Sequence, residues 1–251
     1  MAGQRGTFLV QSRVEGRSVL RQEVLKEGTL PIDVGPIRAA EFPVTENFLY
    51  LNHAGVSPIP ARAAEAGIRM LQRARDEGAY QLRKWEELAS ETRGRFARIV
   101  GASTEEIAFV KNTSEGLSFV AAGFPWKEGD NLITANVEYP SNVYPWMRLR
   151  TRNVLFAACD GKTRLIALSS VEFSNGYRND LPGIGEYCQK HGIFFCVDGI
   201  QSVGVLPMDV KSFGIDALSA DGHKWLLSPE GIGAFYISRE VMEMVEPVIL
   251  G

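Results

Sequence analysis

The sequence has few cysteines, few histidines and no long apolar run. Its three cysteines, Cys159, Cys188 and Cys196, have neither the spacing of a metal site nor that of a disulfide framework. The three histidines are scattered and form no ligand pairs, so we expect no metal site. Apolar runs such as LITANV (132–137) are far shorter than the roughly 20 residues of a membrane-spanning helix, so we expect no membrane segment.

The charge balance and the N-terminus exclude further classes of protein. The chain has 27 basic and 30 acidic residues, a formal charge of −3 and no block of like charge, so we expect no nucleic-acid partner. Residues 1–18 lack the continuous apolar core of a signal peptide. These features favour a reducing, cytoplasmic setting, in which Cys196 is a small core residue rather than a reactive thiol.

The 251 residues, 45% of them hydrophobic, are enough for one large globular domain. Residues 1–36 mix charges, glycines and prolines without a sustained period, which indicates an N-terminal arm or extension. Residues 37–251 form the predicted large domain, with its packed part beginning near Phe42. The spacing of apolar residues over 61–100 predicts two amphipathic helices with a bend near Gly78.

Beyond residue 100, short apolar runs alternate with helix-like stretches. This alternation predicts an α/β fold, with a mostly parallel sheet and helices on both faces. Ligands bind at the carboxyl ends of the strands in such sheets, so the polar residues that end each run are candidates for chemistry. The runs are IAFV (107–110), NLITAN (131–136), RLIALSS (164–170), IFFCVD (193–198) and DALSAD (216–221).

The first polar junction is KNTSEGLSFVAAG (111–123), where Thr113, Ser114 and Gly116 open a helical pattern. Hydroxyls and free backbone N–H groups at a helix N-terminus form an anion site that suits a phosphate. The same residues also suit an ordinary helix cap, in which Ser or Thr satisfies the unpaired donors. The residues alone leave both interpretations open.

The second junction is FFCVDGIQSVG (194–204), which places Asp198 at the end of a buried strand and Gln201 three residues later. A buried carboxylate needs a cation or several donors, and a protonated pyridinium nitrogen would be such a partner. Asp198 could equally cap a following helix.

The third segment, SADGHKWLLSPEGIGAFYISRE (219–240), carries Lys224 directly after Gly222 and His223 in apolar surroundings. A desolvated lysine with a lowered pKa is the residue type that condenses with an aldehyde. Because a lone lysine is usually a surface residue, the weight of this assignment comes from the surrounding pattern.

The pattern D-x-L-S-A-D-G-H-K, followed by a spacer and G-I-G, resembles the class V aminotransferase signature, which contains the lysine that binds pyridoxal 5'-phosphate (PLP). The resemblance covers about residues 42–240 and is strongest to the isopenicillin N epimerase-like and cysteine desulfurase-like branch. It implies the large domain of a PLP-dependent transferase, an α/β/α sandwich. Segments that agree in order and spacing are YLNHAGVSPIP, NTSEG, EYPSNVYPW (138–146), SSVEFSNGYRND (169–180), VDGIQSVG and GHKW.

The resemblance also implies roles for individual residues. Lys224 would hold the cofactor covalently, Asp198 would keep its pyridine nitrogen protonated, and His223 would flank the lysine. These three are the expected catalytic residues, and all three also bind the cofactor. The other implied contacts are Thr113 and Ser114 with the phosphate, Tyr139 stacked on the ring, Gln201 with the ring hydroxyl, Asn175 near that hydroxyl and the substrate carboxylate, and Asn52 and His53 in the substrate loop.

Three departures from the family pattern stand out. Asp221 occupies a position where cysteine desulfurases usually have a phosphate-binding serine. The stretch 146–164 is shorter than in relatives. The chain stops at Gly251, so we expect it to lack the small C-terminal domain that usually supplies an arginine for the substrate carboxylate and, in desulfurases, the catalytic cysteine.

The sequence therefore predicts a PLP-dependent enzyme that acts on an amino-acid substrate by transamination, racemisation, epimerisation or elimination. A homodimer is expected, because the resemblance implies active sites at a subunit interface. The alternative is a truncated, non-catalytic paralogue that binds PLP, or a partial subunit that needs a partner chain.

Overall fold

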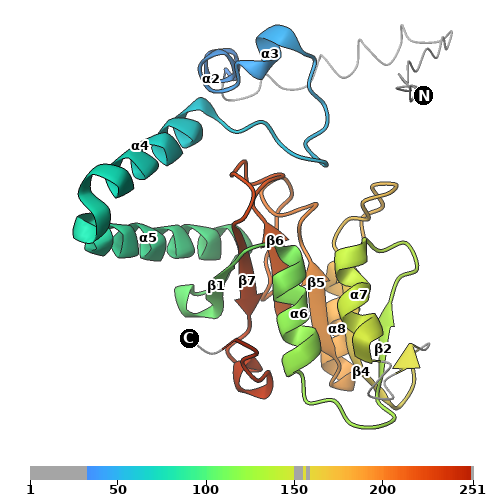
Figure 1. Ribbon diagram of the computed structural model, residues 1–251. Coiled ribbons are helices and arrows are strands. Elements are labelled where there is room, and N and C mark those ends of the chain that lie inside the picture. The colour runs from blue at the N-terminus through green and yellow to red at the C-terminus, as the bar shows by residue number, and fades with distance from the viewer. Residues whose placement is uncertain (1–32, 150–154, 157–158, 250–251) are drawn as a thin grey trace, which may run out of the picture.

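The computed structural model describes residues 33–149, 155–156 and 159–249 (Figure 1). Residues 1–32 of the predicted arm (1–36) therefore lie outside the described residues. Part of the shortened stretch at 146–164 also lies outside them. No helix in the described part of the chain is both long and apolar enough to cross a membrane. The first elements are two short helices, α2 (Gly35–Glu41) and α3 (Val44–Asn47).

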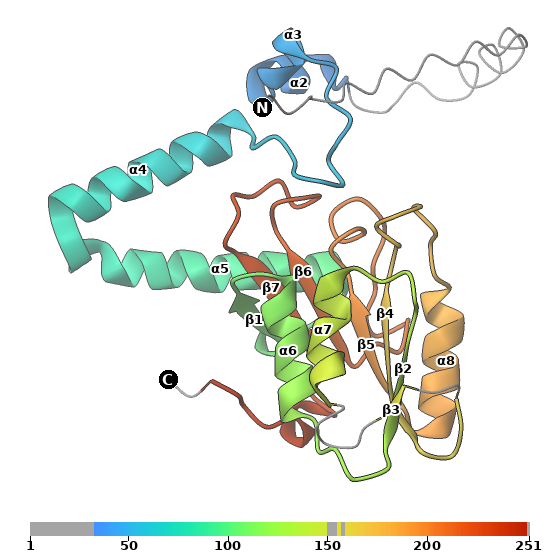
Figure 2. The same cartoon turned by 45° about the vertical axis from the view of Figure 1, so that its right-hand side comes forward.

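A long helical hairpin follows, built from α4 (Ala61–Glu77) and α5 (Leu82–Val100). The short turn η1 (Gly78–Gln81) joins them, and Gly78 has φ of 55°, a conformation that costs glycine little. This confirms the predicted bend. In Figures 1 and 2, α4 extends away from the sheet while the C-terminal half of α5 returns to it. Accordingly, α4 buries none of its residues, whereas the last turns of α5 bury Phe96, Ala97 and Val100.

In the described part of the chain, seven strands form one sheet in the order β1-β7-β6-β5-β4-β2-β3. The pairs from β6 through β3 are parallel, and β7 runs antiparallel to both of its neighbours. The mostly parallel sheet is thus confirmed, with two strands that were not among the five predicted runs, β3 and β7. The strands are β1 (Ile107–Val110), β2 (Asn131–Thr134), β3 (Leu155–Phe156), β4 (Thr163–Ser169), β5 (Phe194–Asp198), β6 (Ala217–Asp221) and β7 (Gly233–Ile237).

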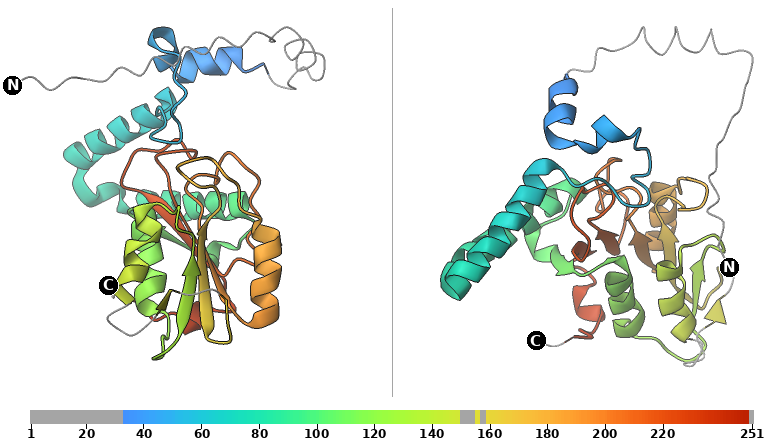
Figure 3. Two further views of the ribbon diagram at one scale, coloured as in Figure 1. Left: turned by 90° about the vertical axis from the view of Figure 1, so that its right-hand side faces the viewer. Right: turned by 45° about the horizontal axis from the view of Figure 1, so that its top comes forward.

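Helices cover both faces of the sheet (Figure 3, left). Strand β5 has apolar side chains on both faces, and each face needs a covering layer. Phe195 and Val197 pack with residues of α5 and α8. Phe194 and Cys196 pack with residues of α6 and α7. Burial raises the pKa of the Cys196 thiol, in keeping with a core residue. The bounds are α6 (Thr113–Gly123), α7 (Tyr144–Met147) and α8 (Leu181–His191), with short turns η2 (Thr104–Glu106), η3 (Pro140–Asn142) and η5 (Met242–Met244).

The N-terminal end of α6 is held close to the sheet by a glycine. A Cβ atom on Gly116 would lie 2.3 Å from Ser219 Oγ, 2.8 Å from Ser219 Cβ and 3.0 Å from the Phe235 ring. Ser219 and Phe235 belong to β6 and β7 and are buried, so they have little room to move. Glycine at this position therefore brings the first turn of α6 against the carboxyl end of β6.

Gly116→Ala should lower the free energy of unfolding by about 1–3 kcal/mol, because the added methyl group overpacks the α6–β6 contact. Gly67→Ala is the matched control: it lies in α4, and its Cβ would meet no atom within 4 Å. There the substitution should be neutral or stabilising by up to about 1 kcal/mol. Urea titration of both variants checks this, and equal effects would contradict the close-packing argument.

Candidate active site

Asp198 forms the floor of the site, at the end of the central strand β5, where its side chain is buried. Its Oδ1 accepts a hydrogen bond from the Ile200 N–H (3.0 Å), whereas its buried Oδ2 has no partner. Burial raises the pKa of this carboxyl to about 7, against the lowering effect of the Ile200 N–H. Turns rather than a helix follow β5, so Asp198 does not cap a helix.

Lys224 lies at the same edge, three residues beyond β6, the strand that pairs with β5. It is half-buried, and its Nζ lies 5.9 Å from the centroid of the Tyr139 ring. Burial lowers the pKa of Lys224, while Asp198 and Asp221 act in the opposite direction. The lysine and the aspartate predicted to act together are therefore electrostatic neighbours.

The turn that carries Lys224 is strained and tightly closed. Leu227 is the only non-glycine residue of the described chain with positive φ (58°), a conformation that is costly for leucine. The Leu227 N–H donates to the Lys224 carbonyl (3.3 Å), and the Ser228 N–H donates to the Gly222 carbonyl (3.0 Å). The surrounding packing must hold this turn in place, which limits the positions that Lys224 can take.

The two hydroxyl residues predicted to bind a phosphate at the N-terminus of α6, Thr113 and Ser114, have different surroundings in the structure. Asn112, not a serine or threonine, is the N-cap, since its side chain accepts from the Glu115 N–H (2.9 Å). Thr113 is buried, and its Oγ1 accepts from the Asp221 N–H (2.9 Å), which ties the helix to β6. Ser114 is exposed. The hydroxyl of Ser114 and the first backbone amides of α6 thus remain for an anion.

Asp221 and His223 contact each other between α6 and the lysine turn. The carboxyl Oδ1 of Asp221 lies 2.9 Å from Nδ1 of His223, and both side chains are largely buried. The structure therefore directs the Asp221 side chain to His223, at the position where a phosphate-binding serine was expected from the family pattern.

The loop at 52–57 is fastened over the lysine turn by contacts that are distant in sequence. The Ser57 N–H donates to the His223 carbonyl (2.8 Å). Gln201 bridges the two segments, because its Nε2 donates to the Ala54 carbonyl (3.1 Å) and its Oε1 accepts from Trp225 Nε1 (3.3 Å). The predicted Gln201 contact with a cofactor hydroxyl stays a prediction.

The two predicted substrate-loop residues differ in their surroundings. The His53 ring stacks on the Trp225 ring, with centroids 5.5 Å apart and planes 12° apart. Asn52 is exposed, and its carbonyl accepts from the Gly55 N–H (3.2 Å). Their contact with a substrate stays a prediction.

Tyr139 and Asn175 lie on two further loops. The Tyr139 ring is half-exposed and meets the Phe173 ring edge-on at 5.1 Å. Asn175 is exposed, and its Oδ1 accepts from the Tyr177 N–H (2.9 Å), so its side chain shapes the turn that carries it. Its contact with a substrate carboxylate stays a prediction.

Sequence reasoning missed two buried acidic residues of this edge, Glu138 and Glu172. Both lie within segments of the family pattern, four residues beyond β2 and three beyond β4, respectively. Their signal in the sequence is a carboxylate just past a buried strand, which is the same signal that identified Asp198.

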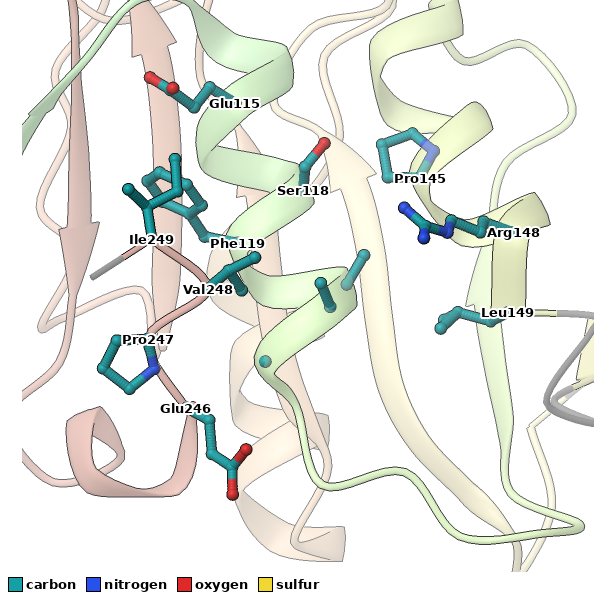
Figure 4. A pocket seen from close by; sticks show the side chains of 13 residues that line it. Glu115, Ser118, Phe119, Pro145, Arg148, Leu149, Glu246, Pro247, Val248 and Ile249 are labelled. Carbon is teal, nitrogen blue, oxygen red and sulfur yellow. The ribbon is translucent and has the colours of Figure 1, made fainter. Parts of the chain in front are cut away.

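A cavity of about 650 Å³ lies elsewhere, between the outer face of α6, Arg148 and residues 246–249 (Figure 4). It includes neither Lys224 nor Asp198, so it is separate from the candidate site. Within the described ranges, no group of three or more His, Cys, Asp or Glu side chains is arranged to hold a metal ion.

The sequence matches the family described as aminotransferase class-V over residues 49–251. A probable cysteine desulfurase of Methanothermobacter thermautotrophicus is 33% identical over 233 residues, which cover 84% of this chain and 58% of the relative. A probable cysteine desulfurase of Pyrococcus abyssi is 31% identical over 234 residues, with the same two coverages.

Solved structures give the same picture. The apo cysteine desulfurase of Thermococcus onnurineus NA1 superposes with a TM-score of 0.78 at 28% identity, covering 89% of this chain and 62% of that one. The cystine C–S lyase C-DES, in complex with its product cysteine persulfide, has a TM-score of 0.80 at 24% identity, with coverages of 84% and 62%. The second likeness concerns the fold alone. The chain spans 58–62% of the length of these four proteins.

The raised pKa of Asp198 predicts a stability that falls with pH. The unfolded carboxyl loses its proton near its ordinary pKa of 3.8, and the folded one near 7, so raising the pH between these values favours the unfolded chain. Over this pH range, the free energy of unfolding of the cofactor-free wild type should fall by roughly 3–4 kcal/mol more than that of the Asp198→Asn variant. Urea titrations of both proteins at pH 4.5 and 7.5 measure the difference, and parallel losses would exclude Asp198 as the source.

Proposed function

Because the chain belongs to the aminotransferase class-V family, we propose that it binds PLP at Lys224 and acts on a small α-amino acid. The family is PLP-dependent, and the relatives and structural neighbours named above are cysteine desulfurases and a cystine C–S lyase. These names support a sulfur-containing amino acid such as cysteine as the substrate class. Because one fold can carry out many different reactions, experiments must determine which bond of the substrate is cleaved.

The observation that carries this proposal is the buried Oδ2 of Asp198, which has no hydrogen-bond partner. A buried polar oxygen without a partner is costly, and a protonated nitrogen placed against it removes that cost. A pyridinium ring is such a group. Lys224 is half-buried and lies at the same edge of the sheet, so one ligand could reach both residues.

The residues at the N-terminus of α6 suit the phosphate of the same ligand. The first amides of the helix and the exposed Ser114 hydroxyl offer donors to an anion, and the helix dipole favours negative charge there. His223 lies between this terminus and the lysine turn and would add a further donor. Tyr139, close to Lys224 Nζ, would cover one face of a flat ring.

When bound, PLP supplies an electron sink for bond cleavage at the α-carbon of an amino acid. Within the protein, partial burial favours the neutral amine of Lys224, which is the nucleophilic form and can also accept a proton. Asp198 would hold a proton at the ring nitrogen, and the loop at 52–57 would limit access of water to the lysine turn.

Lys224→Ala should abolish covalent attachment of PLP while leaving the fold intact, because the side chain is only half-buried and makes no ion pair within the described structure. The protein of residues 1–251 is incubated with PLP, reduced with borohydride and digested, and the modified peptide is identified by mass spectrometry. In the wild type the adduct should lie on Lys224, with Lys190→Ala as a matched surface control. An adduct on the same peptide in Lys224→Ala would refute the assignment.

We also infer that the protein forms a homodimer. Large apolar side chains remain exposed around the candidate site and on the helical hairpin, and patches of this kind mark association surfaces. Twofold pairing is the commonest way for a chain to cover such a surface. They include Phe48 (66%), Leu49 (84%), Leu51 (81%), Leu71 (73%) and Tyr80 (88%).

Sedimentation velocity at micromolar concentration should detect the dimer. Leu71→Glu, which places a charge on the apolar face of α4, should weaken the dimer at least tenfold, since burying an unpaired carboxylate in an interface is costly. Arg73→Glu lies on the opposite face of α4 and serves as the control. A strictly monomeric wild type would contradict the inference.

A further inference from the structure

Three neighbouring strands each deliver one buried carboxyl group to the carboxyl edge of the sheet. In sheet order these strands are β5, β4 and β2, and the groups are Asp198 at the end of β5, Glu172 just beyond β4 and Glu138 just beyond β2. All three are more than nine-tenths buried, and each pair among them interacts electrostatically. We call these three residues the carboxyl cluster.

Both carboxyl oxygens of Glu138 accept a hydrogen bond from Ser169. The Ser169 N–H donates to its Oε1 (2.6 Å), and the Ser169 hydroxyl donates to its Oε2. Ser169 is the register partner of Asp198 on the adjacent strand, so the Glu138 carboxylate is anchored beside the strand end that carries Asp198. Its negative charge therefore opposes the ionisation of Asp198.

Glu172 has one donor and one buried oxygen without a partner. The Asn179 Nδ2 donates to its Oε1 (2.9 Å), while its Oε2 is buried and unpartnered. The same Nδ2 donates to the Ser169 carbonyl (2.8 Å), which links Glu172 to the strand that anchors Glu138. Burial and then the charge of Glu138 raise the pKa of Glu172.

The charges that face Asp198 come from several elements and are mostly negative. Glu138 and Glu172 oppose its ionisation, and Lys224, from the turn after β6, favours it. On its own strand, Cys196 is a buried thiol whose raised pKa keeps it neutral. Among the described residues, one cation thus faces these three carboxyl groups, and their mutual repulsion disfavours the state in which all three are ionised.

We propose that Glu138 and Glu172 are positioning residues that retain a proton on Asp198 in the cofactor-free protein. Asp198 then donates this proton to a basic ring nitrogen lodged against its Oδ2. The O–H bond breaks as the N–H bond forms, and the electron pair stays on the carboxylate, so the charge of the cluster is balanced by the pyridinium. The second step rests on the proposed PLP function, whereas the retained proton does not.

The test follows the Asp198 carboxyl carbon by NMR in the protein of residues 1–251, labelled with ¹³C at aspartate Cγ and freed of cofactor. The resonance is assigned by its loss in Asp198→Asn. It should titrate near pH 7, and Glu138→Gln should lower the midpoint by about one pH unit, as expected for removing one nearby charge. Glu172→Gln should lower it by less, because the charge of Glu172 raises the pKa of Asp198 less than the charge of Glu138 does.

Glu138→Asp retains the negative charge, so the titration midpoint of Asp198 should stay close to the wild-type value. Glu86→Gln lies on the exposed surface of α5 and should leave the midpoint unchanged. A midpoint that stays the same or rises in Glu138→Gln would overturn the proposal. So would an equal fall in Glu138→Asp, which would point to local rearrangement rather than charge.

Adding PLP to the labelled wild type tests the second step. The Asp198 resonance should move to its ionised position at pH 6, where the cofactor-free protein keeps the proton. A bound cofactor with a still protonated Asp198 would refute the proton transfer alone. Failure of PLP to attach to Lys224 would refute the proposed function and leave the titration result standing.

Discussion

The burial of a carboxyl group at the end of the central strand is the constraint on which the site depends. Strand β5 is apolar on both faces, so water cannot solvate Asp198 from either helical layer. One backbone N–H meets one of its oxygens, and the other has no partner. A site of this kind is stable only if the carboxyl keeps a proton or receives a cation, and both solutions favour a ligand with a basic nitrogen.

The elements around this strand hold the predicted site residues by contacts between distant segments. Thr113 at the start of α6 accepts from the backbone of Asp221, and Ser57 of the N-terminal loop donates to the backbone of His223. The lysine turn is therefore fixed from two sides before any ligand arrives. Such preorganisation lets a nearby lysine react without a large loss of conformational entropy.

The sequence was sufficient for features with a local cause. The five apolar runs after residue 100 became strands, and the bend at Gly78 followed from glycine in an amphipathic stretch. It was insufficient where the outcome depends on strand order. Glu138 and Glu172 become neighbours of Asp198 only because β2, β4 and β5 are adjacent in the sheet. Likewise, Asn112 rather than Thr113 caps α6, because the Thr113 side chain points toward β6.

Asp221 shows how one departure from a family pattern changes its neighbours. A carboxylate at a phosphate site repels the phosphate unless a cation accompanies it. Here the carboxyl group faces His223 at 2.9 Å, and a protonated imidazole in that position would cancel its charge. The Asp221 backbone N–H is already used by Thr113, so it offers the phosphate nothing. Under the proposed function, attraction for a phosphate would therefore come from the α6 terminus and from His223 together, rather than from a hydroxyl at position 221.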